Sequence, residues 1–328
     1  MIKAIPVAQL MPGDVLLYRS KGLISDAIRF IDRSEVSHAG LFLGRYGEQG
    51  RTVGEAIRDG VIRRELSKSI EHAAWVESRR LKELPASLDP VLERAAYYLK
   101  RGERYGFEQI LLLAFLCITR SIADSSVLGR LIRETLDAAA AFLLQLFNTG
   151  REPMICSEFV FRCYREALPG AVNLPVRSPG ALRFGEREVP IGKNGGIHRG
   201  SALALLLEKH GSQLSAGSVN LAGPLRAAGP LDVSAVEEAI EAYFDDLQKG
   251  TARAARIDLM SPELQPSFER FAAGLYRARR RPEKTTQPRA AVLGELFDAA
   301  ADFVTPGDLQ KSRSLAFCGK LKNQGVKR

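Results

Sequence analysis

The stretch MICSEFVFRCY, residues 154–164, places a cysteine where an amphipathic helix begins. From Val160 onward the apolar residues have the spacing of a helix packed on a core: Val160, Cys163, Tyr164, Ala167 and Leu168. Cys156 lies four residues before Val160 and shares this inward stripe. Unpaired N–H groups and the positive dipole end of the first helical turn favour a thiolate there. The pattern predicts a nucleophile, although a free cysteine is also an ordinary core residue.

The chain has 328 residues, a formal net charge of +9 and the apolar content of a globular protein. This length accommodates two domains, or one domain with large insertions. The basic residues are spread along the chain, and their densest cluster, RARRRPEK at 277–284, is interpreted as a solvated helix end or linker. Contact of this cluster with anionic lipid is a less favoured alternative. No nucleic-acid partner is expected, since no recognised motif accompanies the charge.

The cysteine spacing argues against metal binding and against a disulfide framework. The four cysteines, Cys117, Cys156, Cys163 and Cys318, contain no CxxC pair. We therefore expect no metal and no cofactor, and a reducing compartment. The N-terminal sequence MIKAIPVAQLMPGD has no long apolar run behind its basic residue, so we expect no signal peptide. We expect a cytoplasmic location instead.

Two apolar stretches predict a helical hairpin over residues 108–147. ILLLAFLCI (110–118) and AAAAFLLQLF (138–147) are too short for a confident membrane span. Packing in the protein core explains them best, and shallow insertion into a bilayer surface, as a peripheral membrane contact, is the alternative.

Turn and strand signals dominate the first third of the chain. MPGDVLLYRS predicts a turn and a short strand, and the glycines and the DG pair that follow divide a β-meander. The predicted elements are a strand at 15–18, a helix at 24–33, strands at 36–43 and 52–57 around the loop 44–51, a third strand from 61, and a helix at 89–101.

The amino-acid composition changes after the cysteine-bearing helix. Residues 183–302 are rich in Ala, Leu, Glu and Arg and predict an all-helical insertion. In the segment VTPGDLQKSRSLAFCGKL, residues typical of a turn and a strand reappear, which indicates that the chain rejoins its first domain. We therefore expect a domain at 1–182 that includes the apolar hairpin, the insertion, and a return segment at 303–328.

A cysteine nucleophile needs a base, and the chain has four histidines. His72 falls in a polar, helix-like run, while His198 and His210 fall in helical material without other chemistry, so these three are interpreted as surface or packing residues. His38 stands in a predicted strand, where alternation places it on one face with Val36, Gly40 and Phe42. This position suits a general base, although a satisfied core histidine has the same pattern.

Glu55 is the candidate that would orient the histidine. In TVGEAI it shares a strand face with Val53 and Ile57. If the loop 44–51 closes an antiparallel hairpin, Glu55 falls opposite or diagonal to His38, within side-chain reach. Its carboxylate would hold one imidazole nitrogen while the other faces Cys156. An outward-facing glutamate in a surface ion pair is the alternative.

The ordered motifs GDVLLYR, SHAGLFLG, VGEA, RYGF, MICSEFVFRCY and TPGDL resemble those of the circularly permuted NlpC-type papain-like amidases, the YiiX-like group. The lecithin:retinol acyltransferase-like enzymes are related permuted members. In this branch the histidine hairpin precedes the cysteine, as it does here. The resemblance covers residues 10–180 and 303–320, and the insertion is left unmatched.

The resemblance implies an α+β fold, with an antiparallel sheet packed on the cysteine-bearing helix. It also implies that Cys156 is the nucleophile, His38 the general base and Glu55 the orienting acid. Tyr164 lies roughly 12 Å along the helix from Cys156, so we expect it to line a substrate pocket or the core.

The expected activity is hydrolysis of an amide or ester through a thioester, as in an amidase or peptidase, with a peptide, cell-wall fragment or lipid as substrate. A lipid-directed acyltransferase is the alternative enzyme, favoured if the apolar helices are exposed. A non-catalytic binding module that presents the insertion is the alternative of another class.

Overall fold

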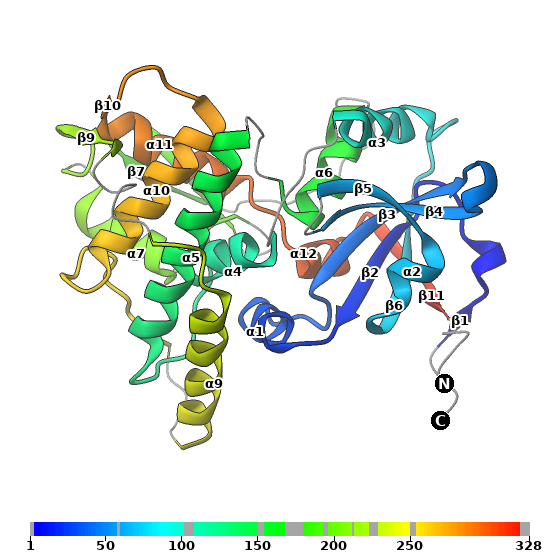
Figure 1. The fold of residues 1–328 in the computed structure, drawn as a ribbon, viewed down its shortest axis with the longest axis horizontal. Helices are drawn as coiled ribbons and strands as arrows, with labels where there is room; N and C mark the ends of the chain where they lie inside the picture. The colour runs from blue at the N-terminus through cyan, green and yellow to red at the C-terminus, as the bar shows by residue number, and fades with distance from the viewer. Residues whose placement is uncertain are drawn as a thin grey trace. The chain divides into compact units, whose positions relative to one another are not determined.

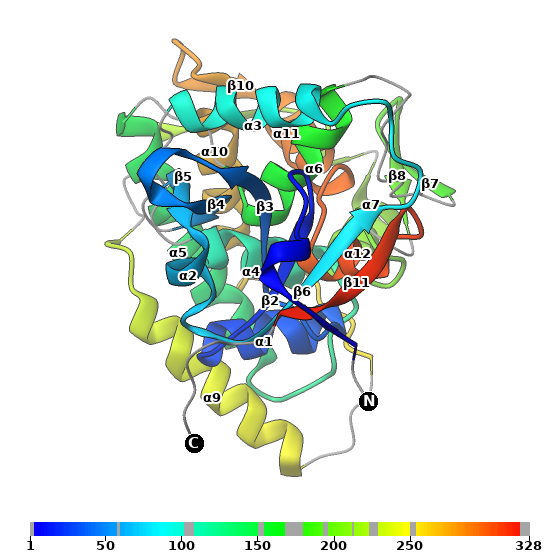
Figure 2. The same ribbon diagram turned by 90° about the vertical axis from the view of Figure 1, so that its right-hand side faces the viewer.

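The computed structural model describes residues 3–57, 60–101, 108–149, 154–167, 180–192, 196–211, 213–222, 229–249 and 254–321. The chain forms two compact units (Figures 1 and 2). Unit 1 comprises Met1–Glu108, Met154–Val176 and Val304–Arg328, and unit 2 comprises Gln109–Pro153 and Arg177–Phe303. The α+β class is confirmed by this mixture of one large sheet and many helices.

Unit 1 is built on a seven-stranded sheet with the order β1-β11-β6-β2-β3-β4-β5. Its strands are β1 (Ala4–Ile5), β2 (Val15–Ser20), β3 (His38–Arg45), β4 (Arg51–Ile57), β5 (Gly60–Glu65), β6 (Ala73–Leu81) and β11 (Leu315–Leu321). Each neighbouring pair is antiparallel except β1 and β11, which are parallel. The prediction of a wholly antiparallel sheet was therefore wrong at one edge, because a two-residue strand joins β11 in the same direction.

Helices and short 3-10 turns surround this sheet. They are η1 (Val7–Gln9), α1 (Leu23–Asp32), η2 (Gly47–Gln49), α2 (Leu66–Ile70), α3 (Asp89–Arg101), α6 (Cys156–Ala167) and α12 (Pro306–Lys311). Helix α6 packs on β3 and β4, and α3 lies beside α6 (Figure 1). Gly54 permits this packing, since a Cβ there would lie 3.1 Å from Cζ of Phe159. The cysteine-bearing helix thus contacts the strands that carry the predicted histidine and glutamate.

Strand β6 replaces the helical pattern expected around His72. It is a central strand, flanked by β2 and β11, yet it buries the polar residues Glu77 and Ser78. Arg79 stabilises Glu77 through an ion pair with Nε and Oε1 2.8 Å apart. Polar residues on a buried strand hide the period-two alternation, which explains the error.

The segment TPGD, expected to form a turn, starts helix α12. Asp308 and Thr305 form a capping box, with Thr305 Oγ1 accepting from the Asp308 N–H at 3.0 Å. Thr305 Oγ1 also donates to Oδ2 of the buried Asp32 at 2.7 Å. A carboxylate of α1 therefore fixes the point where the chain returns to unit 1.

Unit 2 is mainly helical. Its helices include α4 (Glu108–Thr119), α5 (Leu128–Thr149), α7 (Ala202–His210), α9 (Val233–Lys249), α10 (Gln265–Arg280) and α11 (Arg289–Ala301). Two small antiparallel sheets join them, formed by β7 (Gly180–Phe184) with β8 (Arg187–Ile191) and by β9 (Ser218–Asn220) with β10 (Thr286–Pro288). The prediction of an all-helical insertion missed these strands.

The apolar hairpin belongs to unit 2, although we expected it in the first domain. Helix α5 packs along α10 and α9, so the insertion supplies the surfaces that bury it. The apolar side chains of α4 from Ile110 to Ile118 are all buried, and Phe115 stacks on Phe303 with ring centroids 4.9 Å apart. None of the described helices combines the length and apolar content that crossing a bilayer requires.

Candidate active site

The three predicted site residues begin or lie within elements of unit 1. Cys156 is the first residue of α6, His38 is the first residue of β3, and Glu55 lies in β4. All three are buried, with exposed fractions of 0%, 7% and 1%. The RYGF segment at 104–107, which contributed to the resemblance, lies outside the described residues.

His38 and Glu55 are hydrogen-bonded across neighbouring strands. Gly40 pairs with Glu55, so Glu55 is diagonal to His38, and its Oε2 lies 3.1 Å from His38 Nε2. Gly40 keeps this region open: a Cβ there would lie 2.8 Å from Cγ1 of Val53 and 3.3 Å from Oη of Tyr18. The glycine of SHAGL, Gly40, is therefore small for a steric reason.

The pKa values indicate which group carries the proton. Burial raises the pKa of Glu55, but hydrogen bonding and charge from His38, the charge of Arg64 and a hydrogen bond from Ser69 outweigh it, so the net pKa lies below the usual 4.5. Arg64 Nη1 lies 3.6 Å from Glu55 Oε1. Glu55 is thus an ionised acceptor at neutral pH, and Nε2 of His38 donates to it.

The second ring nitrogen of His38 is left for Cys156. Nδ1 is buried and has no hydrogen bond of ordinary geometry within the described part of the chain. Burial lowers the pKa of His38, but the charge of Cys156 and the contact with Glu55 raise the net pKa well above 6.5. The negative charge of a Cys156 thiolate would thus favour the protonated form of His38. Hydrogen bonds of catalytic groups are often long without substrate and tighten when it binds.

Two hydroxyl groups that sequence reasoning missed extend the network. Ser69 Oγ donates to Glu55 Oε2 at 3.2 Å, and Tyr18 Oη lies 2.7 Å from Ser69 Oγ. The Tyr18 ring also packs on the imidazole of His38, with centroids 5.1 Å apart and planes inclined by 57°. Tyr18 could have been found as an inward residue of GDVLLYR, paired with His38. Ser69 had no sequence signal, since it lies on the separate helix α2.

Tyr164 does not share this network. It is fully buried, and its hydroxyl donates to the backbone carbonyl of Gly13. Burial raises the pKa of its phenol above the ordinary value. Of the two locations expected for Tyr164, the structure places it in the core, where it joins α6 to the loop before β2.

The start of α6 adds backbone donors. The first N–H groups of any helix lack an intrahelical acceptor and point out of its N-terminus. Ser157 secures this end, because its Oγ donates to the Val304 carbonyl at 2.7 Å. The helix start is thus suited to hold a developing negative charge beside Cys156.

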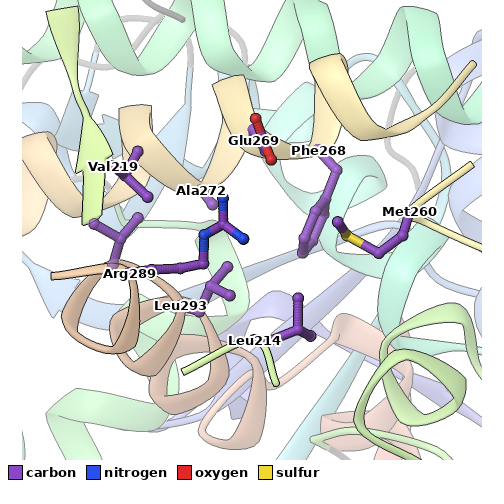
Figure 3. Close-up of a pocket in the computed structure, with 9 residues that line it drawn as sticks. Leu214, Val219, Met260, Phe268, Glu269, Ala272, Arg289 and Leu293 are labelled. Atoms are coloured by element: carbon purple, nitrogen blue, oxygen red, sulfur yellow. The ribbon is translucent and has the colours of Figure 1, made fainter. Parts of the chain in front are cut away.

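A pocket in unit 2 contains none of the predicted site residues (Figure 3). Its cavity volume is about 20 Å³, between α10, α11, β9 and neighbouring loops, and its lining is Leu214, Val219, Met260, Phe268, Glu269, Ala272, Arg289, Val292 and Leu293. Among the described residues, no group of three or more His, Cys, Asp or Glu side chains is arranged to hold a metal ion.

Comparisons with known proteins place this site in a context. No family model matches the chain. The chain is similar to the "Probable lipoprotein peptidase YaeF" of Escherichia coli (strain K12), with 28% identity over 169 residues, which are 51% of this chain and 59% of that protein. The chain therefore matches little more than half the length of this curated relative.

One solved structure also aligns with the chain. It is the crystal structure of the metalloprotein YiiX from Escherichia coli O157:H7, with 16% identity and a TM-score of 0.38 over 95% of this chain and 98% of that one. A TM-score of this size does not indicate a common fold.

Proposed function

We propose that the protein is a cysteine hydrolase of the amidase or peptidase type, with Cys156 as nucleophile, His38 as acid and base, and Glu55 as the group that orients His38. The observation that carries the proposal is the buried Glu55–His38 hydrogen bond, beside a cysteine that begins a helix. The order His38, Glu55, Cys156 resembles that of the permuted NlpC-type enzymes. The peptidase name of the 28% identical relative supports the same reaction class.

In the proposed acylation, the Cys156 thiolate attacks the carbonyl carbon of an amide or ester and forms a C–S bond. Backbone N–H groups at the start of α6 stabilise the oxyanion. When the intermediate collapses, the C–N or C–O bond breaks, and the leaving amine or alcohol takes the proton from His38 Nδ1. The product is a thioester on Cys156 and a neutral His38.

In the proposed deacylation, His38 takes a proton from water, and the resulting hydroxide attacks the thioester carbon. The C–S bond breaks, the acid leaves, and the thiolate and imidazolium are restored. Glu55 stays ionised and accepts from Nε2 throughout. It therefore keeps the imidazole in the one orientation that presents Nδ1 to Cys156.

Acylation by p-nitrophenyl acetate, followed by intact mass spectrometry, tests the proposal. The wild-type chain is expected to gain one acetyl group at Cys156 and then to lose it, with continuing release of nitrophenol. Cys156→Ala should gain none, while Cys163→Ala, a change farther along the same helix, should behave as wild type. If wild type and Cys156→Ala react alike, the binding-module alternative replaces the hydrolase.

A mixture of fluorogenic peptide amides and esters then defines the substrate. Peptide cleavage that is lost in Cys156→Ala supports a peptidase, and turnover of esters alone supports an esterase or acyltransferase.

A further inference from the structure

The buried carboxylate of Glu55 accepts from two different side chains through one oxygen. Its Oε2 lies 3.1 Å from His38 Nε2 and 3.2 Å from Ser69 Oγ. Glu55 is 1% exposed, so protein groups must provide what water would otherwise supply to the carboxylate. Arg64 Nη1 lies 3.6 Å from the other oxygen, Oε1. Ser69 is therefore a third group, besides His38 and Arg64, that determines how the carboxylate lies.

The donor and the acceptor of each hydrogen bond in this network follow from the chemistry of the groups. Ionised Glu55 can only accept, so Ser69 uses its single proton to donate to it. The 2.7 Å contact between Tyr18 Oη and Ser69 Oγ then requires Tyr18 to be the donor. Burial and the charge of Glu55 raise the pKa of the Tyr18 phenol well above 10, so that proton stays on the tyrosine. The order is Tyr18 to Ser69 to Glu55, with His38 donating from the other side.

Resting on the proposed function, we propose that Ser69 and Tyr18 are positioning residues, which hold the Glu55 carboxylate in the orientation that aligns His38 with Cys156. Ser69 acts on the carboxylate, and Tyr18 acts twice. Its hydroxyl keeps the Ser69 proton directed at Glu55, and its ring packs on the imidazole at 5.1 Å. In this proposal both residues act through Glu55 and His38 rather than on the substrate.

The test is the pH dependence of Cys156 alkylation by iodoacetamide, measured in Ser69→Ala, Ser69→Thr and Tyr18→Phe. Loss of a hydrogen bond to a charged group should slow alkylation about tenfold or more at neutral pH. It should also move the acid limb of the profile to higher pH, because a misaligned His38 stabilises the Cys156 thiolate less. Ser69→Thr keeps the hydroxyl and should restore the wild-type profile, and Tyr18→Phe should shift it less than Ser69→Ala.

Two matched variants control for the loss of a buried hydroxyl elsewhere. Tyr98 donates to Glu166 Oε2 at 2.7 Å in unit 1, and Ser267 donates to Asp137 Oδ2 at 3.0 Å in unit 2. Tyr98→Phe and Ser267→Ala should leave the acid limb unchanged, because neither group contacts Glu55. A substitution that only weakens packing would lower the free energy of unfolding and leave the acid limb of the alkylation profile unchanged.

The outcomes separate the inference from the proposed function. If His38→Ala slows alkylation but Ser69→Ala and Tyr18→Phe keep the wild-type profile, the positioning role is wrong and the proposed function stands. If His38→Ala also has no effect, the proposed function fails. Circular dichroism verifies folding, and Tyr18→Phe carries the test if Ser69→Ala does not fold.

Discussion

Cys117 in unit 2 and Cys156 in unit 1 are both fully buried, but the groups around the two thiols differ. Cys117 lies within α4 of unit 2, where burial raises its pKa to about 12. Cys156 begins α6 of unit 1 and faces a histidine whose pKa it raises. Burial alone makes a thiol inert, whereas burial beside an oriented imidazole suits a nucleophile.

The buried charges of the two units differ in the same way. In unit 2, Glu295 is 5% exposed and is held by Arg279, at 2.6 Å, and by Arg280. This ion-paired cluster joins α10 to α11 and uses the basic run at 277–284. In unit 1, hydrogen bonds join Tyr18, Ser69, Glu55 and His38. The first arrangement stabilises packing, and we assign the second to chemistry.

The largest expected effect is on acyl transfer. Cys156→Ala should lower p-nitrophenyl acetate turnover by about 10⁴-fold or more, as expected when a nucleophile is removed. Cys117→Ala removes an equally buried thiol and should retain wild-type turnover. Steady-state nitrophenol release measures both, and equal losses in the two variants would break the contrast between the units.

The next effect concerns stability in unit 2. Leu112 is fully buried in α4, so Leu112→Ala should lower the free energy of unfolding by about 2–5 kcal/mol, through lost apolar contact and a cavity. Leu112→Met nearly conserves volume and should cost less than about 1.5 kcal/mol. Urea unfolding measures both. If Leu112→Ala slowed Cys156 alkylation under folding conditions as much as His38→Ala, the site would not be confined to unit 1.

A smaller effect is expected at Gly40. The added methyl of Gly40→Ala would meet Cγ1 of Val53 at 2.8 Å and the Tyr18 hydroxyl at 3.3 Å. Overpacking of this kind typically lowers the free energy of unfolding by about 1–3 kcal/mol. Alkylation of Cys156 should slow as well. Gly180→Ala, in open space on β7, is the control for a glycine change in a strand. Equal behaviour of the two variants would show that Gly40 has no steric role.

The smallest expected effect is a pH dependence of stability. The pKa of Glu55 is lowered on folding, so its contribution to stability is present above the unfolded value of about 4.5 and is lost as the pH falls through the folded pKa. The difference in free energy of unfolding between wild type and Glu55→Gln should therefore shrink as the pH falls through the folded pKa. Thermal melting from pH 7 to pH 3 measures it, and a constant difference would mean that Glu55 is not the ionised partner of His38.

Much of unit 1 could be predicted because its strands are short apolar runs bounded by turn residues. In SHAGLFLG and TVGEAI the polar residues stand among apolar ones, so His38 and Glu55 were recognisable. The sequence left Glu55 opposite or diagonal to His38, and the register shift between Phe42 and Gly44 makes it diagonal. Strand β6 was missed because it buries Glu77 and Ser78; the ion pair with Arg79 offsets the burial of Glu77. Ser69 was missed because no local pattern shows which distant hydroxyl meets a carboxylate.

In unit 2, composition identified helices but not their partners. The apolar run of α4 was recognised as core material, yet a sequence pattern does not specify which helices cover it. The β7–β8 hairpin was missed because short strands in Ala- and Leu-rich surroundings carry a weak signal. Its turn at Gly185 requires a φ of 57°, which glycine adopts readily.

The most direct test of the account is the rate of Cys156 alkylation by iodoacetamide against pH, followed by mass spectrometry in wild type and His38→Ala. A free thiol gains reactivity only near its pKa of about 8.5. We expect wild-type Cys156 to react fast well below that pH, and His38→Ala to lose this advantage. If Cys156 reacts no faster than Cys318, which is partly exposed, and His38→Ala changes nothing, the Cys156–His38 pair has no chemical role.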